Sequence, residues 1–258
     1  MKCFFYFTTK YLIYYGIMLV IINGMVGKRM TSKKWLNGFA ILLFIVGLAF
    51  LMRGYFEGFL IKRVTNDNQF NQISVETIRE NEMIEGEFEF DQTANLTWEH
   101  ILNGYQNRED LPVIGGLSIP SIALQLPILK GLAESNLVAG AGTMAADQRM
   151  GQGNYSLAGH NYARNQILFS DIPYMTIGDT IYITDMETIY VYELNWLEMV
   201  TPDRVDLVEE VPGRKMITLI TCSLDLTMRW VGQGDLVETV AVADASAELL
   251  AALNLIEE

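Results

Sequence analysis

The sequence predicts an all-β domain, either a closed barrel or a sandwich, with short helices and an N-terminal transmembrane anchor before it. Many short runs of β-branched and aromatic residues lie between residues 113 and 242, and glycine, proline or polar turns separate them. Strands and helices do not alternate along this stretch, which argues against a parallel sheet covered by helices. An uncharged apolar stretch at 35–52 has close to the length that spans a bilayer.

The predicted anchor is an uncleaved signal anchor. The sequence KRMTSKK at 28–34 places four positive charges before the apolar stretch, and such flanks stay in the cytoplasm. No small-residue cleavage site follows the stretch, which argues against a removed signal peptide. The basic flank and the anchor are therefore assigned to residues 30–62, and the chain after Arg53 is expected outside the cell.

A second apolar stretch at 11–27 precedes the basic flank. It either forms the first helix of a membrane hairpin, which makes the protein two-pass, or belongs to an extension over residues 1–29 ahead of a true start at Met30. The second interpretation is favoured, and both place the C-terminal domain outside.

Charge divides the chain into two parts. Residues 1–63 carry nine Lys or Arg and one acid, whereas residues 64–258 carry nine Lys or Arg and 30 acids. An acidic domain of this kind is a poor partner for nucleic acid or for another polyanion. Residues 63–95 are rich in Asn, Gln, Glu and Thr, which predicts an acidic polar stalk or a loosely held helix before the folded domain at 96–258.

Local patterns predict the elements of the exported domain. Apolar residues at helical spacing over 96–106 indicate a helix, with His100 beside its apolar stripe as a packing or surface residue. The last helix is expected after Asp244 as its N-cap. Between them we expect strands at 117–120, 122–129 and 155–160, a short helix and loop at 131–154, a hairpin at 178–200 with its turn near 185–187, a polar connection at 201–215, and strands at 216–222 and 229–242.

Three polar residues end or begin these strands. Cys222 ends MITLITC, His160 ends YSLAGH, and Arg229 begins the next strand after a six-residue loop. A loop that short brings Cys222 and Arg229 to the same end of a sheet if the strands are antiparallel neighbours. The position of His160 does not follow from spacing.

If the three side chains converge, they suit acyl transfer. A thiolate attacks a carbonyl carbon, a histidine supplies a base and then an acid, and an arginine stabilises an oxyanion. Taken singly, Cys222 also suits a buried core thiol, His160 a turn residue and Arg229 a strand decoration. The chain has two cysteines, two histidines and no CxxC or HExxH spacing, so neither a disulfide framework nor a metal site is expected.

Together, the segments IPSIALQLPIL, SLAGHN and TLITC, followed by an arginine and preceded by the anchor, resemble a sortase. Sortases are membrane-anchored cysteine transpeptidases of Gram-positive bacteria. The resemblance covers about residues 96–243 and points to the housekeeping class A, which lacks a C-terminal membrane segment; LLAALNLIEE at the C-terminus is too short and acidic to span a membrane. It implies a closed eight-stranded β-barrel.

The resemblance also implies a reaction and its residues. The enzyme would cleave the Thr–Gly bond of an LPXTG-type sorting signal through a thioacyl on Cys222, and pass the surface protein to an amine of a lipid II-type peptidoglycan precursor. His160 would be the acid and base, Arg229 would hold the substrate and stabilise the oxyanion, and Ala158 and Thr221 would line the substrate groove.

The sequence departs from the family pattern at two places. The interval from Cys222 to Arg229 is shorter than is typical of the family. Some class A members bind calcium through acids before the AGH motif, but 131–159 offers only Glu134 and Asp147, with Glu209 and Glu210 as distant additions, so calcium independence and no cofactor are expected. The alternatives are a pilin-polymerising sortase of another class and a non-catalytic, membrane-tethered β-domain.

Overall fold

The computed structural model of the protein describes residues 33–88 and 96–256. The chain divides into two compact units, Met1–Arg53 and Gly54–Glu258. The expected apolar stretch at 11–27 and the possible extension over 1–29 lie outside the described residues.

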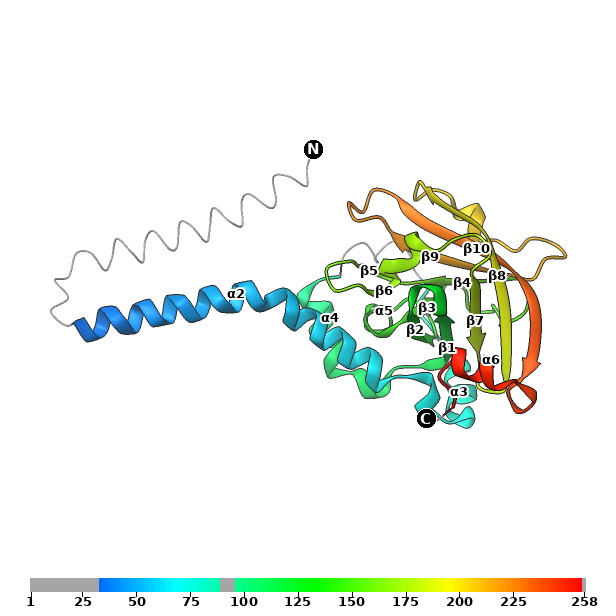
Figure 1. The fold of residues 1–258 in the computed structure, drawn as a ribbon, viewed down its shortest axis with the longest axis horizontal. Helices are drawn as coiled ribbons and strands as arrows, with labels where there is room; N and C mark the ends of the chain where they lie inside the picture. Colours follow the sequence, from blue (N-terminus) through cyan, green and yellow to red (C-terminus); the bar gives the residue numbers. More distant parts are fainter. Residues whose placement is uncertain (1–32, 89–95, 257–258) are drawn as a thin grey trace. The chain divides into compact units, whose positions relative to one another are not determined.

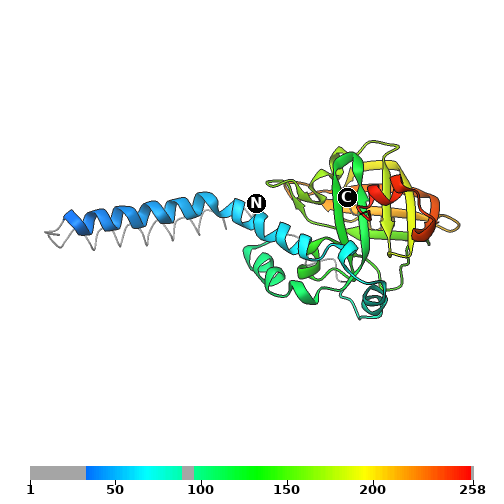
Figure 2. The same cartoon turned by 60° about the horizontal axis from the view of Figure 1, so that its bottom comes forward.

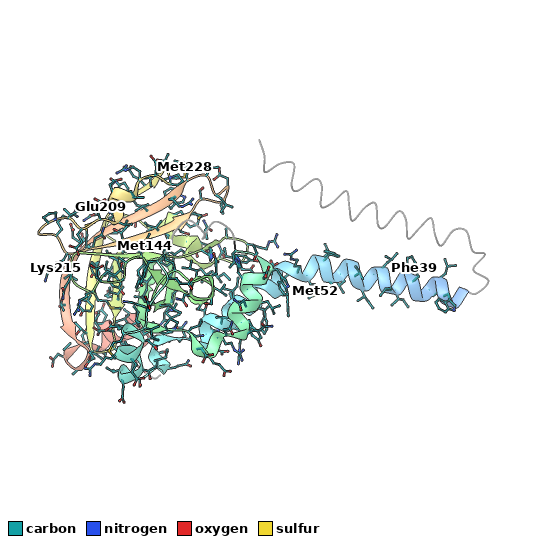
Figure 3. The ribbon with its side chains drawn as sticks, turned by 180° about the vertical axis from the view of Figure 1, so that it is seen from behind. Phe39, Met52, Met144, Glu209, Lys215 and Met228 are labelled. Atoms are coloured by element: carbon teal, nitrogen blue, oxygen red, sulfur yellow. The ribbon has the colours of Figure 1, made fainter. Side chains whose placement is uncertain are left out.

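The described part of the first unit is the N-terminal part of helix α2 (Lys33–Asp67). Side chains from 35 to 53 are exposed apart from that of Phe39, which is half-buried, and Figure 3 shows Phe39 and Met52 projecting outward from the helix. The helix is long and apolar enough from Trp35 to Asp67 to cross a membrane. This finding fits the predicted anchor, because an apolar surface without protein neighbours suits a lipid environment.

The second unit is built on a closed barrel of eight strands in the order β1-β2-β3-β4-β9-β10-β8-β7, which confirms the predicted fold. Figures 1 and 2 show the strands curving around a common interior. Pairing of β1 with β7 closes the barrel; β2 with β3 and β4 with β9 pair in parallel, and the other neighbours are antiparallel. The strands are β1 (Val113–Ile119), β2 (Leu124–Leu129), β3 (Ala141–Thr143), β4 (Asn154–Ala158), β7 (Thr180–Thr184), β8 (Thr188–Val200), β9 (Met216–Cys222) and β10 (Arg229–Ala241).

Short helices and one small hairpin surround the barrel. The helices are α3 (Val75–Glu82), α4 (Trp98–Gln106), α5 (Glu134–Ala139) and α6 (Ala247–Ala252), and the hairpin joins β5 (Asn161–Tyr162) to β6 (Ile167–Leu168). Helix α4 begins where its pattern predicts, with the Thr97 hydroxyl accepting the His100 N–H. The predicted cap of the last helix is wrong: Ser246, not Asp244, accepts the Leu249 N–H, because residues 242–244 form a separate 3₁₀ turn.

Aliphatic, β-branched and aromatic side chains from every side of the barrel fill its interior. The large side chains of Leu117, Ile128, Tyr155, Phe169 and Tyr192 are among those almost completely buried. Burying such side chains supplies most of the driving force for folding. The interior of the barrel is therefore a packed hydrophobic core.

The polar stalk or loosely held helix expected at 63–95 is attached to the core over its described residues 64–88, which include the end of α2 and helix α3. Val64, Phe70 and Ile78 are fully or almost fully buried, and the first two belong to the main core. The Phe70 ring occupies the space beside Gly116 in β1, where an added Cβ would lie 2.2 Å from a ring carbon. A few apolar side chains thus attach this segment to the barrel, although most of its residues are polar. This part of the predicted stalk belongs to the folded unit.

Candidate active site

Cys222 and Arg229 meet at one rim of the barrel. They are the last residue of β9 and the first residue of β10, and they are Cα partners in that antiparallel pair. The loop between them is closed by Ser223, whose hydroxyl accepts the Met228 N–H at 3.0 Å and donates to the Asp225 carboxylate at 2.6 Å. The short interval therefore keeps the two residues together, as the sequence predicted.

His160 reaches the same rim because β4 and β9 pair in parallel. Parallel strands end at the same edge of a sheet, so His160, two residues beyond β4, lies near the end of β9. Two hydrogen bonds extend this pairing past the strand: the Gly159 N–H donates to the Ile220 carbonyl at 3.1 Å, and the Thr221 hydroxyl donates to the Gly159 carbonyl at 2.8 Å. The spacing of residues in the sequence could not predict this position of His160, because β4 and β9 are far apart along the chain.

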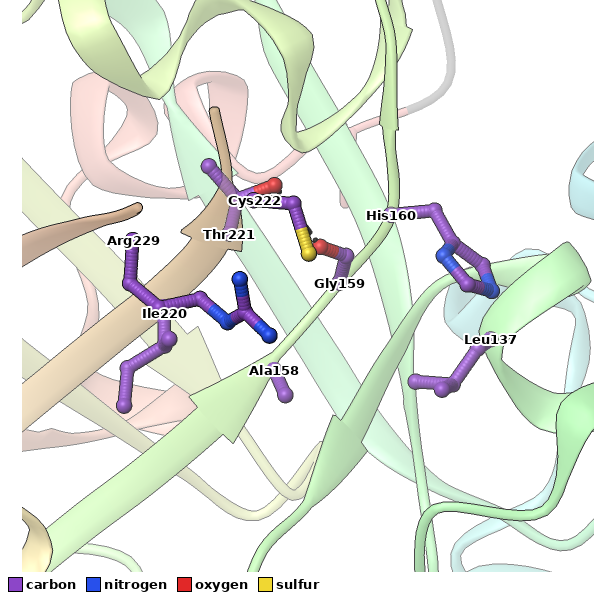
Figure 4. Close-up of a pocket in the computed structure, with 8 residues that line it drawn as sticks. All are labelled: Leu137, Ala158, Gly159, His160, Ile220, Thr221, Cys222 and Arg229. Atoms are coloured by element: carbon purple, nitrogen blue, oxygen red, sulfur yellow. Dashed lines mark hydrogen bonds between the residues drawn. The ribbon is translucent and has the colours of Figure 1, made fainter. Parts of the chain in front are cut away.

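One pocket contains all five residues that the sequence singled out (Figure 4). In Figure 4 the Cys222 sulfur lies between the Arg229 guanidinium on one side and the His160 ring on the other. Gly159 leaves no room for a side chain, because an added Cβ would lie 2.7 Å from a ring carbon of Phe169. The lining residues are Leu137, Ala158, Gly159, His160, Ile220, Thr221, Cys222 and Arg229.

The Cys222 thiol is unpaired and half-buried. Burial raises its pKa, and the positive charge of Arg229 lowers it by a smaller amount, so the net pKa lies above the ordinary value of a cysteine. The thiol form is therefore favoured at rest, and a nearby base has to take the proton before the sulfur becomes a strong nucleophile.

The Arg229 guanidinium is held by the loop that precedes it. Its Nη1 donates to the carbonyl oxygens of Leu226 at 3.3 Å and Met228 at 3.0 Å. Its buried Nε has no hydrogen-bond partner within the described part of the chain. A buried donor left open beside a pocket is suited to an oxygen atom of a ligand.

Two contacts of the rim residues were not expected from the sequence. Asn161 donates from Nδ2 to the Cys222 carbonyl at 2.9 Å. Glu134 Oε2 lies 3.4 Å from His160 Nε2 and 3.2 Å from His100 Nδ1, so His100 adjoins the site through Glu134. Asn161 directly follows the histidine in SLAGHN and could have been singled out, whereas no sequence signal links Glu134 and His100 to His160.

Comparisons with known proteins point to one family. Residues 117–237 match the family model described as a sortase domain. Sortase A of Streptococcus agalactiae is 33% identical over 239 residues, which cover 87% of this chain and 97% of the relative. Sortase A of Bacillus anthracis is 38% identical over 215 residues, covering 82% of this chain and 99% of the relative.

A solved structure shares the fold as well. The crystal structure of Listeria monocytogenes sortase A matches with a TM-score of 0.52 and 35% sequence identity, and the match covers 56% of this chain and 99% of that one. The likeness in sequence extends over nearly the whole length of two relatives, and the barrel is the one that the motifs predicted. The chain belongs to the sortase family, in its class A, and is a sortase transpeptidase.

Proposed function

We propose that Cys222 is the nucleophile of this transpeptidase, that His160 is its acid and base, and that Arg229 stabilises the oxyanion. The observation that carries the proposal is the presence of all three side chains in one pocket, although His160 lies 62 residues before Cys222 in the sequence. The proposed substrate is a surface protein with an LPXTG-type sorting signal, cleaved between Thr and Gly.

Acylation begins when His160 takes the proton of the Cys222 thiol. The thiolate attacks the threonine carbonyl carbon, a C–S bond forms, and the carbonyl oxygen becomes an oxyanion beside the Arg229 guanidinium. The C–N bond to glycine then breaks, and the imidazolium of His160 gives its proton to the departing amine. The product is a thioester on Cys222 and a released peptide that begins with glycine.

Transfer reverses these roles with a different amine. An amine of a peptidoglycan precursor attacks the thioester carbonyl, and His160 accepts the proton that the amine loses. The C–S bond breaks, Cys222 leaves as a thiolate, and its proton returns from His160. The surface protein ends in an amide bond to the precursor, and the enzyme regains its starting state.

Ala158 and Thr221 would border the groove that receives the signal. Both line the pocket, and Ala158, Leu137 and Ile220 contribute apolar side chains to its wall. Apolar walls with a few polar groups are typical of pockets that hold a small extended ligand. No cofactor is required by these steps.

The proposed location is the cell membrane, with a single pass over 35–52 and the barrel outside the cell. The apolar helix and the basic residues before it support this orientation. Protease added to intact cells should digest the barrel; survival of the barrel until the cells are broken would place it in the cytoplasm instead.

The full chain in detergent, incubated with an LPXTG peptide and no amine acceptor, tests the chemistry. Peptide mapping by mass spectrometry should find the acyl group, ending in threonine, on Cys222. The chain has only one other cysteine, so Cys3→Ser is a matched control that should keep the adduct, while Cys222→Ala should lose it. An adduct that persists in Cys222→Ala would rule out the proposed nucleophile.

A further inference from the structure

The Glu134 carboxylate lies between the only two histidines of the chain. Its Oε2 atom is 3.4 Å from Nε2 of His160 and 3.2 Å from Nδ1 of His100. The three residues come from separate elements: Glu134 begins α5, His100 lies in α4, and His160 follows β4. The His160 side chain is only 7% exposed and that of Glu134 is 24% exposed.

Four polar atoms of this cluster have no other hydrogen-bond partner among the residues that the structure describes. Within the described part of the chain, His160 Nε2, His100 Nδ1 and both carboxylate oxygens of Glu134 are buried and lack an aligned hydrogen bond. Buried polar atoms without partners are costly, so a cluster of them at a functional site calls for an explanation. The contacts of Glu134 with His100 and His160 are the interactions that can offset the cost of burying these atoms.

We propose that Glu134 is a positioning residue for His160, and that His100 in turn holds the Glu134 carboxylate. The proposal rests on the proposed function, in which His160 exchanges protons with Cys222 and with the amines. Glu134 does not line the pocket, so it acts through the imidazole and not on the substrate.

The geometry assigns a separate role to each ring nitrogen of His160. Nε2 faces Glu134, and Figure 4 shows the other ring nitrogen on the side of Cys222. A carboxylate beside Nε2 favours the tautomer that carries its proton there. The lone pair of Nδ1 is then free to accept the Cys222 proton.

The carboxylate also stabilises the product of that proton transfer. When His160 becomes an imidazolium, its new positive charge lies next to Glu134, in a site with little exposed surface. His100 Nδ1 lies 3.2 Å from the same oxygen, and in the proposed role this contact would limit the rotation of the Glu134 side chain. Loss of either residue should therefore affect the chemical steps more than substrate binding.

Steady-state kinetics on the full chain in detergent, with an LPXTG peptide and an amine acceptor, tests this role. Glu134→Gln keeps the shape and removes the charge, and kcat should fall about 10-fold to 100-fold, less than the ~10²–10⁴-fold that a general acid–base group itself contributes. KM for the peptide should stay the same. Glu134→Asp should recover part of kcat, and His100→Gln should lose less than Glu134→Gln.

Asp147→Asn is the matched control, because Asp147 is the other acid between residues 131 and 159 and is exposed. It should leave kcat and KM unchanged. An unchanged kcat in Glu134→Gln, or a rise in KM with the same kcat, would overturn the proposal.

A spectroscopic measurement that needs no substitution at Glu134 keeps the proposal testable if Glu134→Gln folds poorly. Two-bond ¹H–¹⁵N spectra of ¹⁵N-histidine-labelled protein at alkaline pH should show neutral His160 as a single tautomer with its proton on Nε2. The two histidines are told apart with His100→Gln. A mixture of tautomers, or the proton on Nδ1, would overturn the assignment.

The outcomes separate this proposal from the proposed function. If the thioacyl forms on Cys222 and Glu134→Gln keeps full kcat, only the role of Glu134 fails. If no thioacyl forms on Cys222 in the unmodified chain, the proposed function fails first.

Discussion

Cys222 and Arg229 are directly opposed on two antiparallel strands. Side chains of directly opposed residues lie on the same face of a sheet, so the guanidinium and the sulfur are neighbours by register. The register also explains why the Arg229 charge lowers the pKa of Cys222. Burial of the thiol raises this pKa by a larger amount. The tight loop that joins them is thus a means of keeping a cation beside the thiol.

Replacing the arginine should make the thiol harder to ionise. In Arg229→Gln the positive charge is lost and burial remains, so the pKa of Cys222 should rise and the midpoint of its alkylation by iodoacetamide should move to higher pH. Transpeptidation should fall by about 10²–10³-fold if Arg229 also binds the oxyanion. Arg229→Lys keeps the charge and should shift the midpoint less; a midpoint that stays or falls in Arg229→Gln would contradict the pairing.

Asn161 should stabilise the end of β9. Its side chain donates to the carbonyl of Cys222 at 2.9 Å, so Asn161→Leu removes a hydrogen bond that holds the backbone of the proposed nucleophile. The free energy of unfolding should fall by about 0.5–1.5 kcal/mol, measured by denaturant titration, and kcat should fall with it. Asn195→Leu is the control, because Asn195 makes an exposed bond to Asp235 away from the pocket. Equal losses of unfolding free energy and of kcat in both variants would contradict the prediction that Asn161 stabilises the end of β9.

The sequence predicted those features of the fold that depend on neighbouring residues in the chain. Short apolar runs between turns predicted most of the barrel strands and the hairpin at 178–200, and a six-residue loop predicted the meeting of Cys222 and Arg229. Strand β3 was not predicted, because it lies in the Gly- and Ala-rich stretch at 131–154 that was expected to be a short helix and a loop. His160 was brought into the site only by the family resemblance, because its place depends on the parallel pairing of β4 and β9. Parallel pairing joins segments that are far apart in the sequence and has no local signature.

The contacts missed from the sequence share the same cause. The His100–Glu134 contact needs α4 to pack on α5, and neither helix shows its partner in its own pattern. Residues 64–88 were expected to be solvated because average composition hides a few apolar side chains, which the structure nevertheless buries. Tertiary packing decided both cases.

Calcium should have no effect on the rate. Calcium prefers six to eight oxygen ligands, and the acids available near the AGH motif are few. Asp147 is exposed, and Glu134 lies between two histidines instead of facing a second acid. Transpeptidation rates with calcium and with chelator should agree, and Glu209→Gln and Glu210→Gln should leave both rates unchanged. A several-fold stimulation by calcium, lost in either variant, would contradict the prediction.

Phe70 should be as important to stability as a residue of a barrel strand. Its ring is fully buried and fills the space beside Gly116, so Phe70→Ala leaves a cavity against β1. Substitutions of this kind cost about 3–5 kcal/mol, which is a large part of the stability of a typical domain. Met83→Ala is the matched control, because Met83 follows in the same segment and is 80% exposed. Denaturant unfolding should separate the two variants clearly. Equal unfolding midpoints would contradict this prediction and indicate that residues 64–88 form a solvated stalk. A segment that does not contribute to the core can lose an aromatic ring without loss of stability.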